Sequence, residues 1–266
     1  MNRPLIGLVI LVIAGAIGGG WYYWRSSRAQ PAPVTMAVEA PPPPAAPQEA
    51  APVHPVPEAG PDFGNAPLPA LNDSDPAIRN ALDQVFGAAT VMQYLAPENI
   101  IRRIVVTVDN LARQKAPLQQ RPVGTAPGAF IAAGDELHAS IDPKNYARYQ
   151  PMVSVIRNLD LQRLTALYVH FYPLFQRSYE DLGYPNAYFN DRLVEVIDIL
   201  LATPTPAAPP ELVRPNVMYL YADPAIEARP AGQKLLMRMG ADNAKAVKAK
   251  LMELRAAVTA APIKHK

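Results

Sequence analysis

The side chains that could carry chemistry in this sequence are few and widely spaced. The chain contains no cysteine, which excludes disulfides, thiolate nucleophiles and cysteine-bound metals. Its histidines share no metal-ligand spacing; they are His54, His138, His170 and His265. The signatures of dinucleotide, nucleotide, zinc-protease, serine-hydrolase and calcium sites are missing from the sequence. We therefore expect no catalytic residue, no metal site and no cofactor.

Acid–base catalysis is the chemistry that still has candidates. His170 lies in an aromatic run, where it could act as a general base or pack at the edge of a core. A glycosidase-type pair needs two carboxylates about 5 to 10 Å apart in a cleft. The acidic pairs of the chain are Asp73/Asp75, Asp135/Glu136 and Glu180/Asp181. Helix capping and exposed turns explain these pairs more simply than a cleft does, so a hydrolase is the alternative function.

Arginine and tyrosine side chains give the best candidate for a binding surface. Asp109, Asn110 and Arg113 share the polar face of one amphipathic segment, where they could form a polar network, a partner site or a solvated face. Seven tyrosines lie between Tyr146 and Tyr188, and tyrosine suits both a binding groove and the wet rim of a core. The candidate binding surface comprises Arg102, Arg103, Asp109, Asn110, Arg113, Tyr146, Tyr149, His170, Tyr172 and Tyr184.

Helices must position most of these residues. Asp75-Pro76 predicts a helix that begins with an aspartate cap and stops at Gly87. The apolar residues of segment 97–112 recur with a helical period, and this period outweighs their β-branched side chains. Asp142, Asp160 and Asp223 predict further helix starts. The helix after Asp160 is long, and Pro173 lies inside it as an expected kink.

The strand signals are few and short. Residues 130–141 predict a small hairpin that turns at Gly134, and residues 217–221 predict one further strand. Residues 115–129 and 203–215 are rich in proline or glycine and are expected to be loops. The sequence therefore predicts a mainly α, helical bundle-like domain over residues 70–266 with a minor β hairpin and strand.

The N-terminal residues 1–28 are expected to form a transmembrane anchor. Residues 5–24 contain no charge, and twenty helical residues span about 30 Å, the thickness of the hydrocarbon core. The four aromatic residues 21–24 at the end of this segment fit the aromatic belt of a membrane interface. The rival interpretation is a signal peptide cleaved after Ala14-Gly15-Ala16. Gly15 and Gly19 form a GxxxG pattern that would allow a dimer, although glycine is common in membrane helices.

Residues 29–69 are expected to be a disordered Pro/Ala-rich linker with polyproline II character. They contain thirteen prolines, and such a composition cannot bury enough apolar surface to offset its ordering entropy. The charges that flank the anchor are balanced, so they leave its orientation open. The short N-terminal head and long spacer favour a bacterial inner-membrane protein with a periplasmic domain.

Several phrases of the folded part resemble one bacterial family. They are LPALNDSDP (68–76), RRIVVTVDNLARQKAP (102–117), NYARYQPMV (145–153), SYEDLGYPNAYFNDRL (178–193) and YLYADPAIEARPAGQKLLMRMG (219–240). They look like the family catalogued as domain of unknown function 3014. The resemblance implies a membrane segment, a proline-rich spacer and a helical domain. Because that family has no assigned activity, the resemblance implies no site residue.

The charge is uneven along the folded part. Residues 71–228 carry a net charge of −4 and residues 229–266 a net charge of +7. A basic end of this kind could face lipid, an acidic partner or nucleic acid, but the lack of interleaved aromatics argues against nucleic acid. We predict a non-enzymatic binding or scaffold protein with an unknown protein or cell-wall partner. The alternatives are a periplasmic hydrolase acting on cell-wall material and a cytoplasm-facing adapter with a basic C-terminal helix.

Overall fold

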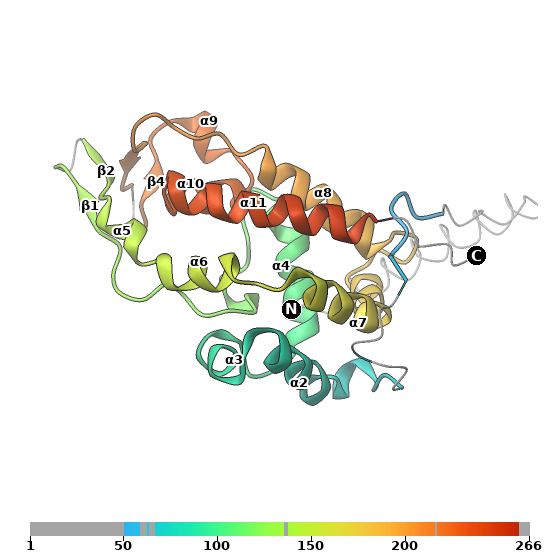
Figure 1. Cartoon of the computed structure of the whole chain (residues 1–266). Helices are drawn as coiled ribbons and strands as arrows, with labels where there is room; N and C mark the ends of the chain where they lie inside the picture. The colour runs from blue at the N-terminus through green and yellow to red at the C-terminus, as the bar shows by residue number, and fades with distance from the viewer. Residues whose placement is uncertain (1–50, 59–62, 64–66, 136–137, 216, 261–266) are drawn as a thin grey trace, which may run out of the picture. The chain divides into compact units, whose positions relative to one another are not determined.

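Helices make up most of the chain that the structure describes. The computed structural model describes residues 51–58, 63, 67–135, 138–215 and 217–260, which belong to one compact unit, Glu49–Lys266 (Figure 1). The α-helices are α2 (Asp75–Phe86), α3 (Ala88–Tyr94), α4 (Ile100–Leu111), α5 (Lys144–Ala147), α6 (Gln150–Arg157), α7 (Leu161–Asp181), α8 (Phe189–Leu201), α9 (Pro224–Glu227), α10 (Ala231–Arg238) and α11 (Ala241–Val258). Two 3-10 turns, η2 (Leu71–Asp73) and η3 (Leu118–Gln120), join them.

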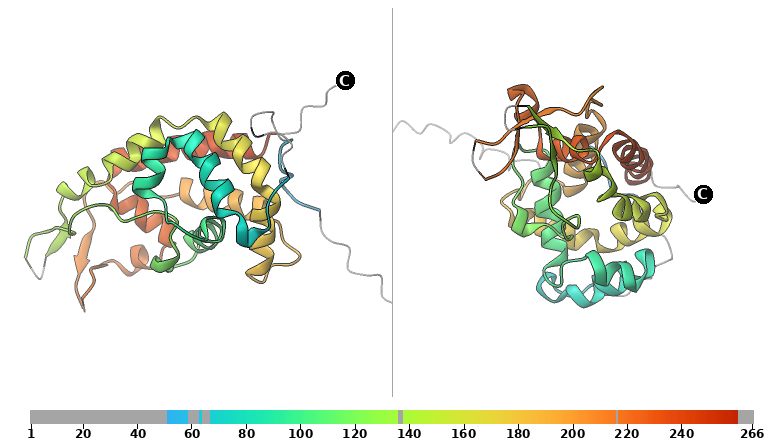
Figure 2. Two further views of the ribbon diagram at one scale, coloured as in Figure 1. Left: turned by 90° about the horizontal axis from the view of Figure 1, so that it is seen from below. Right: turned by 90° about the vertical axis from the view of Figure 1, so that its left-hand side faces the viewer.

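A small antiparallel sheet lies at one end of this unit. Its strands are β1 (Ala132–Ala133), β2 (Ala139–Ile141), β3 (Glu211–Val213) and β4 (Leu220–Tyr221), paired in the order β1-β2-β3-β4. Figures 1 and 2 show the sheet at the opposite end of the domain from the first described residues, 51–58. The prediction of a mainly α domain with a minor sheet is confirmed.

Helix α4 forms the centre of the main core. Its residues Ile100, Ile101 and Val105 are at most 1% exposed, and the helix packs against α2, α7, α8 and α10. Burying one such side chain contributes roughly 1.5–3 kcal/mol relative to leaving it exposed. The helical period therefore predicted this segment correctly despite its β-branched residues. Four helices pack around α4, and a helix with a wide apolar face suits such surroundings.

Three of the four predicted aspartates accept a backbone hydrogen bond at the start of the helix that follows them, and the fourth differs. The carboxylates of Asp160 and Asp223 accept backbone hydrogen bonds in the first turns of α7 and α9, and that of Asp142 accepts from the N–H of Lys144 at the start of α5. Asp75 was expected to cap its own helix, but Ser74 precedes α2 and the Asp75 carboxylate points elsewhere. It accepts from the backbone N–H groups of Asn99 (2.6 Å) and Ile100 (2.8 Å) at the start of α4. A side chain of α2 thus caps the N-terminus of α4.

The strand prediction was partly wrong. Only Leu220 and Tyr221 of the expected strand 217–221 pair in the sheet, and β3 lies inside the expected loop 203–215. Leu212 of β3 pairs with Ala139 on one side and Tyr221 on the other. A three-residue strand carries almost no periodic signal, and its partner β2 lies about seventy residues away in the sequence, so local pattern could not find it.

Part of the segment expected to be a linker contacts the folded domain. Segment 51–58 lies against the start of α8, where the backbone of Val53 and His54 hydrogen-bonds to Asp191. Phe63 also packs against the main core and stacks on His170 with ring centroids 6.2 Å apart. The composition predicted disorder, but proline-rich chain can still dock in an extended form when a folded surface offers hydrogen-bond partners.

The remaining N-terminal predictions lie outside the described residues. These are the anchor at residues 5–24, the Gly15/Gly19 dimer face, the cleavage site at 14–16 and the linker over 29–50. Among the helices of the described ranges, none is both long enough and apolar enough to cross a bilayer.

Gly240, between α10 and α11, gives a first testable prediction. Its φ is 85°, and a Cβ there would lie 2.7 Å from the ring of Tyr146. Gly240→Ala should therefore lower the free energy of unfolding by about 2 kcal/mol, through backbone strain and overpacking. Gly183→Ala is the matched control, because Gly183 also has a positive φ (104°) but open space around it. Equal losses in urea unfolding would show that the contact with Tyr146 contributes nothing.

Candidate functional site

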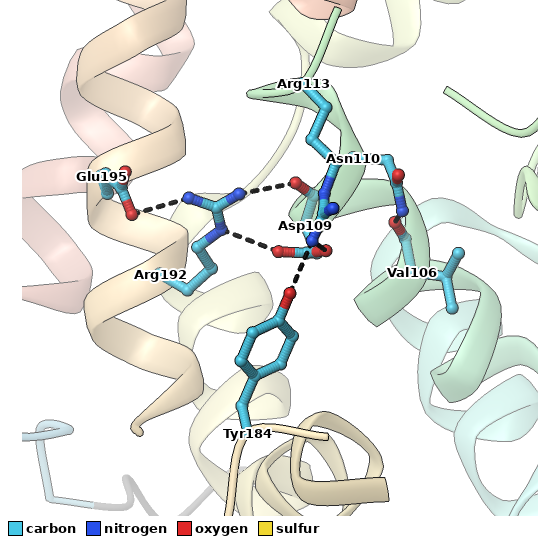
Figure 3. A network of polar contacts seen from close by, with 7 residues as sticks. All are labelled: Val106, Asp109, Asn110, Arg113, Tyr184, Arg192 and Glu195. Carbon is cyan, nitrogen blue, oxygen red and sulfur yellow. Dashed lines mark hydrogen bonds and ion pairs between the residues drawn. The ribbon is translucent and has the colours of Figure 1, made fainter. Parts of the chain in front are cut away.

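A buried carboxylate near the end of α4 forms the centre of the strongest polar cluster. Asp109 is 4% exposed. Arg113, one turn later, donates from Nη2 to its Oδ2 at 2.8 Å, and Arg192 of α8 donates from Nε to its Oδ1 at 3.0 Å (Figure 3). Each carboxylate oxygen therefore faces its own guanidinium, which is the arrangement that makes a buried charge tolerable.

The two arginines extend the cluster to neighbouring elements. Arg192 also donates to the backbone oxygen of Asp109 at 2.7 Å and to the carboxylate of Glu195 at 2.7 Å. Arg113 donates to the Tyr184 hydroxyl at 2.5 Å, and the Tyr184 ring stacks on Tyr179 at 4.6 Å. The cluster thus fastens α4, α8 and the connection between α7 and α8 to one another.

The electrostatics of the cluster hold its cations in their charged form. The hydrogen bond and the charge of Asp109 raise the pKa of Arg113 above its usual value. Burial opposes the charge of Arg192, but the hydrogen bond and charge of Glu195, together with Asp109, outweigh it, so its pKa is also raised. A carboxylate held between two permanent cations is a poor general base, so the cluster is suited to positioning rather than to catalysis.

The structure brings together Asp109, Arg113 and Tyr184 from the predicted surface and disperses the other candidates. Arg102 donates to Asp181 and Asn72, and Arg103 donates to backbone oxygens of residues 98 and 119. Asn110 donates to a backbone oxygen within its own helix. These three side chains therefore hold the fold locally.

The other aromatic candidates also lie apart from one another. Tyr146 and Tyr149 pack near the sheet and beneath α10 and α11, in separate clusters. His170 contacts Phe171 edge-on at 4.9 Å, at the other end of the core. Tyr172 donates to Gln176 at 3.1 Å, and burial raises its pKa to about 12. The tyrosines are thus core and rim residues rather than one continuous groove.

Sequence reasoning missed Arg192, Glu195 and Asn190. All three lie on α8, in a stretch that reads as an ordinary amphipathic helix. The i, i+3 spacing of Arg192 and Glu195 indicates a local ion pair. Nothing in the sequence indicates that Arg192 meets Asp109, because that contact joins residues 83 positions apart.

The cavities found among the described residues are small. One of them has a volume of about 300 Å³, at the lower limit for a small-molecule site. Residues of segment 51–58, of the end of α7, of the α7–α8 connection and of α8 line it, including Val53, Tyr179, Tyr188, Arg192 and Glu195. It is open and adjoins the Asp109 cluster through Arg192. In the described ranges, no group of three or more metal-binding side chains lies close enough to hold an ion.

An exposed apolar surface lies on the sheet. In the β3–β4 hairpin, Leu212 and Tyr221 face inward and are each 2% exposed, while their neighbours Val213 and Leu220 pair on the outward side. Alternation of this kind normally places polar side chains outward. We define the hairpin patch as the exposed apolar residues of this region: Phe130, Ile131, Val213, Val217, Met218 and Leu220.

Arg214 and Tyr219 lie beside the hairpin patch. Arg214 lies 5.4 Å from the ring centroid of Tyr219. On the inner side of the hairpin, Arg238 lies 5.3 Å from the ring centroid of the buried Tyr221. Phe130 contacts Tyr219 with centroids 5.5 Å apart, which joins the two hairpins of the sheet. Arginine, tyrosine and methionine are the residue types that protein interfaces favour.

The basic C-terminal part is mostly paired within the domain. Arg255 of α11 donates to both carboxylate oxygens of Asp198 on α8, at 2.5 and 2.9 Å. Lys248 donates to the backbone oxygen of Thr203, and Lys234 pairs with Glu227 at 2.7 Å. These contacts use the basic residues to dock α10 and α11 on more acidic neighbours.

Comparison with known proteins gives one match. The model of a family described as "Protein of unknown function (DUF3014)" matches residues 100–255. No curated protein and no solved structure matches the chain.

Proposed function

The chain belongs to the DUF3014 family. We propose that it is a membrane-tethered, non-catalytic binding module that recognises a protein partner through the hairpin patch. The observation that carries this proposal is the exposed apolar outer face of the β3–β4 hairpin. Val217 is 79% exposed and Met218 is 65% exposed, next to Val213 and Leu220. Contiguous apolar surface with a polar rim is typical of interaction sites.

The position of the patch supports a tethered binder. The first described residues, 51–58, lie at one end of the domain and the sheet lies at the other (Figures 1 and 2). The hairpin patch therefore lies clear of residues 51–58, which leaves it accessible to a partner. An anchor at residues 5–24 and a periplasmic domain complete the proposal, on the grounds of the uncharged segment and the long spacer.

Four acidic side chains considered in the sequence favour a binder over the hydrolase alternative: Asp75, Asp109, Glu180 and Asp181. Asp109 is neutralised by two arginines, and Asp75 accepts two backbone hydrogen bonds. Glu180 and Asp181 lie near Arg177 and Arg102 on the surface. None of these carboxylates is left in a deep cleft with a second carboxylate opposite it, which is the arrangement that glycoside hydrolysis needs.

In-cell photo-crosslinking at matched methionines tests the proposed function. A photo-reactive residue at Met218 should give a discrete adduct with one protein, and one at Met252 of α11, which is 58% exposed, should not. Val217→Asp combined with Leu220→Asp should abolish the adduct formed from a label at Phe130 without unfolding the domain, because exposed sites tolerate charge. Identical adducts from both methionines, or adducts that survive the double aspartate change, would contradict the proposal.

The side of the membrane needs a separate measurement. Fusions of alkaline phosphatase and of a fluorescent protein to the C-terminus should give phosphatase activity and no fluorescence when the domain is periplasmic. The opposite pair of results would contradict the periplasmic placement and leave the hairpin patch available to a cytoplasmic partner.

A further inference from the structure

Residues 51–58 have a sequence that favours an extended chain. The segment reads APVHPVPE, with prolines at positions 52, 55 and 57. Proline fixes its own φ, and it also disfavours the helical region for the residue before it. The segment therefore loses little conformational entropy when it docks in extended form. We call residues 51–58 the strap.

The domain holds the strap through its backbone. The N–H groups of Val53 and His54 donate to the two oxygens of Asp191, at 3.0 and 2.6 Å. The backbone oxygen of His54 accepts from Nδ2 of Asn190 at 2.8 Å. The Val53 side chain is 76% exposed, so it adds little to the contact. These hydrogen bonds recognise an extended backbone rather than particular side chains.

The receptor for the strap is rigid. Asn190 is fully buried; it accepts from the Tyr168 hydroxyl at 2.9 Å and also donates to the backbone oxygen of Val258 at 3.1 Å. Asp191 lies in the first turn of α8, where the helix dipole favours a carboxylate. The fold therefore holds the Asn190 side chain in place, and the helix N-terminus favours the Asp191 carboxylate beside it.

The strap also forms one wall of the cavity of about 300 Å³ beside the Asp109 cluster. Ala51 and Val53 contribute that wall, and the opposite side is built by Tyr179, Arg192 and Glu195. Removal of the strap would leave Asp191 without its two donors and would open this side of the cavity. Docking of the strap therefore couples the proline-rich chain to the surface around Arg192.

We propose that Asn190 and Asp191 form a binding site for an extended, proline-containing peptide segment, and that the strap of the same chain is its resident occupant. Docked, the strap shortens the tether that precedes the domain. Released, its eight residues return about 25 Å of extended chain at roughly 3.1 Å per residue. The site thus sets how far the domain reaches, independently of whether the hairpin patch binds a partner.

Spin-label distances in the full-length protein test the proposal. The chain has no cysteine, so Ala51→Cys and Met252→Cys provide the only two labelling sites; both positions are exposed. Double electron–electron resonance should give a narrow distance distribution. Asp191→Ala should remove the narrow peak, and Asp242→Ala, which removes an acidic residue from the first turn of α11, should leave it unchanged.

A second pair of variants tests whether the backbone is what the site recognises. Val53→Pro keeps an extended φ but removes the N–H donor, so it should also remove the narrow peak. Val53→Ala keeps the donor and should preserve it. A broad distribution in the parent protein, or a narrow one in both Asp191→Ala and Val53→Pro, would overturn the proposal. A narrow peak that disappears when labelled protein is diluted with unlabelled protein would place the strap on a second copy and would contradict the intramolecular assignment.

Discussion

Asp109→Ala should lower the free energy of unfolding by about 3–5 kcal/mol, because it removes the buried carboxylate that pairs with the partly buried guanidinium of Arg192. The side chain of Arg192 is 16% exposed, whereas that of Arg113 is 51% exposed. Most of the loss should therefore come from Arg192. Urea unfolding followed by far-ultraviolet circular dichroism measures it, since the two tryptophans, Trp21 and Trp24, lie outside the described domain.

Asp198→Ala is the matched control for this prediction. Asp198 also pairs with an arginine, Arg255, but its side chain is 48% exposed. Loss of such a surface pair should change stability by less than about 1 kcal/mol. Equal effects of Asp109→Ala and Asp198→Ala would mean that burial of the Asp109 cluster contributes nothing.

Asn190→Ala should lower the free energy of unfolding by about 3 kcal/mol, because one buried amide serves three separate parts of the fold. Its loss leaves the hydroxyl of Tyr168 and the backbone oxygen of Val258 without this partner in the interior, and each such group costs about 1–3 kcal/mol. Asn158→Ala, at an exposed asparagine whose amide bonds only to the oxygen of Ser154 in its own helix, should change stability by less than about 0.5 kcal/mol.

Comparison of Asn190→Ala with Asp191→Ala separates stability from docking. Among the described residues, the hydrogen bonds to the Asp191 carboxylate all come from the strap. Removal of this carboxylate should therefore release the strap and leave the unfolding midpoint nearly unchanged. A large loss of stability in Asp191→Ala, or a loss below 1 kcal/mol in Asn190→Ala, would contradict this division of roles.

The local sequence pattern predicted the structure correctly where the contacts that determine it lie within one helix. The period of α4 and the capping carboxylates of Asp160 and Asp223 lie within single helices, so the sequence predicted them correctly. Asp75 shows the limit: the sequence identified its chemistry as a cap but assigned it to α2, because the choice between α2 and α4 depends on how the two helices pack.

The candidate site was predictable only in part for the same reason. Asp109 and Arg113 are one helical turn apart, so their contact follows from spacing. Tyr184 and Arg192 join them through tertiary packing, and neither the burial of Asp109 nor the role of Arg192 leaves a local signal. The strap is a further case, since its composition predicts an unfolded chain and only Asn190 and Asp191 explain why it docks.

The carboxylate of Asp75 has a consequence for the order in which the domain assembles. The first turn of α4 is capped by a group that lies twenty-four residues earlier, so formation of α2 stabilises this turn. At the other terminus, Val258 is fully buried and its backbone oxygen bonds to Asn190. Asp75 and Val258 both lie outside residues 100–255, the span of the family match. The span matched by the family model therefore leaves out residues that stabilise the domain at both of its ends.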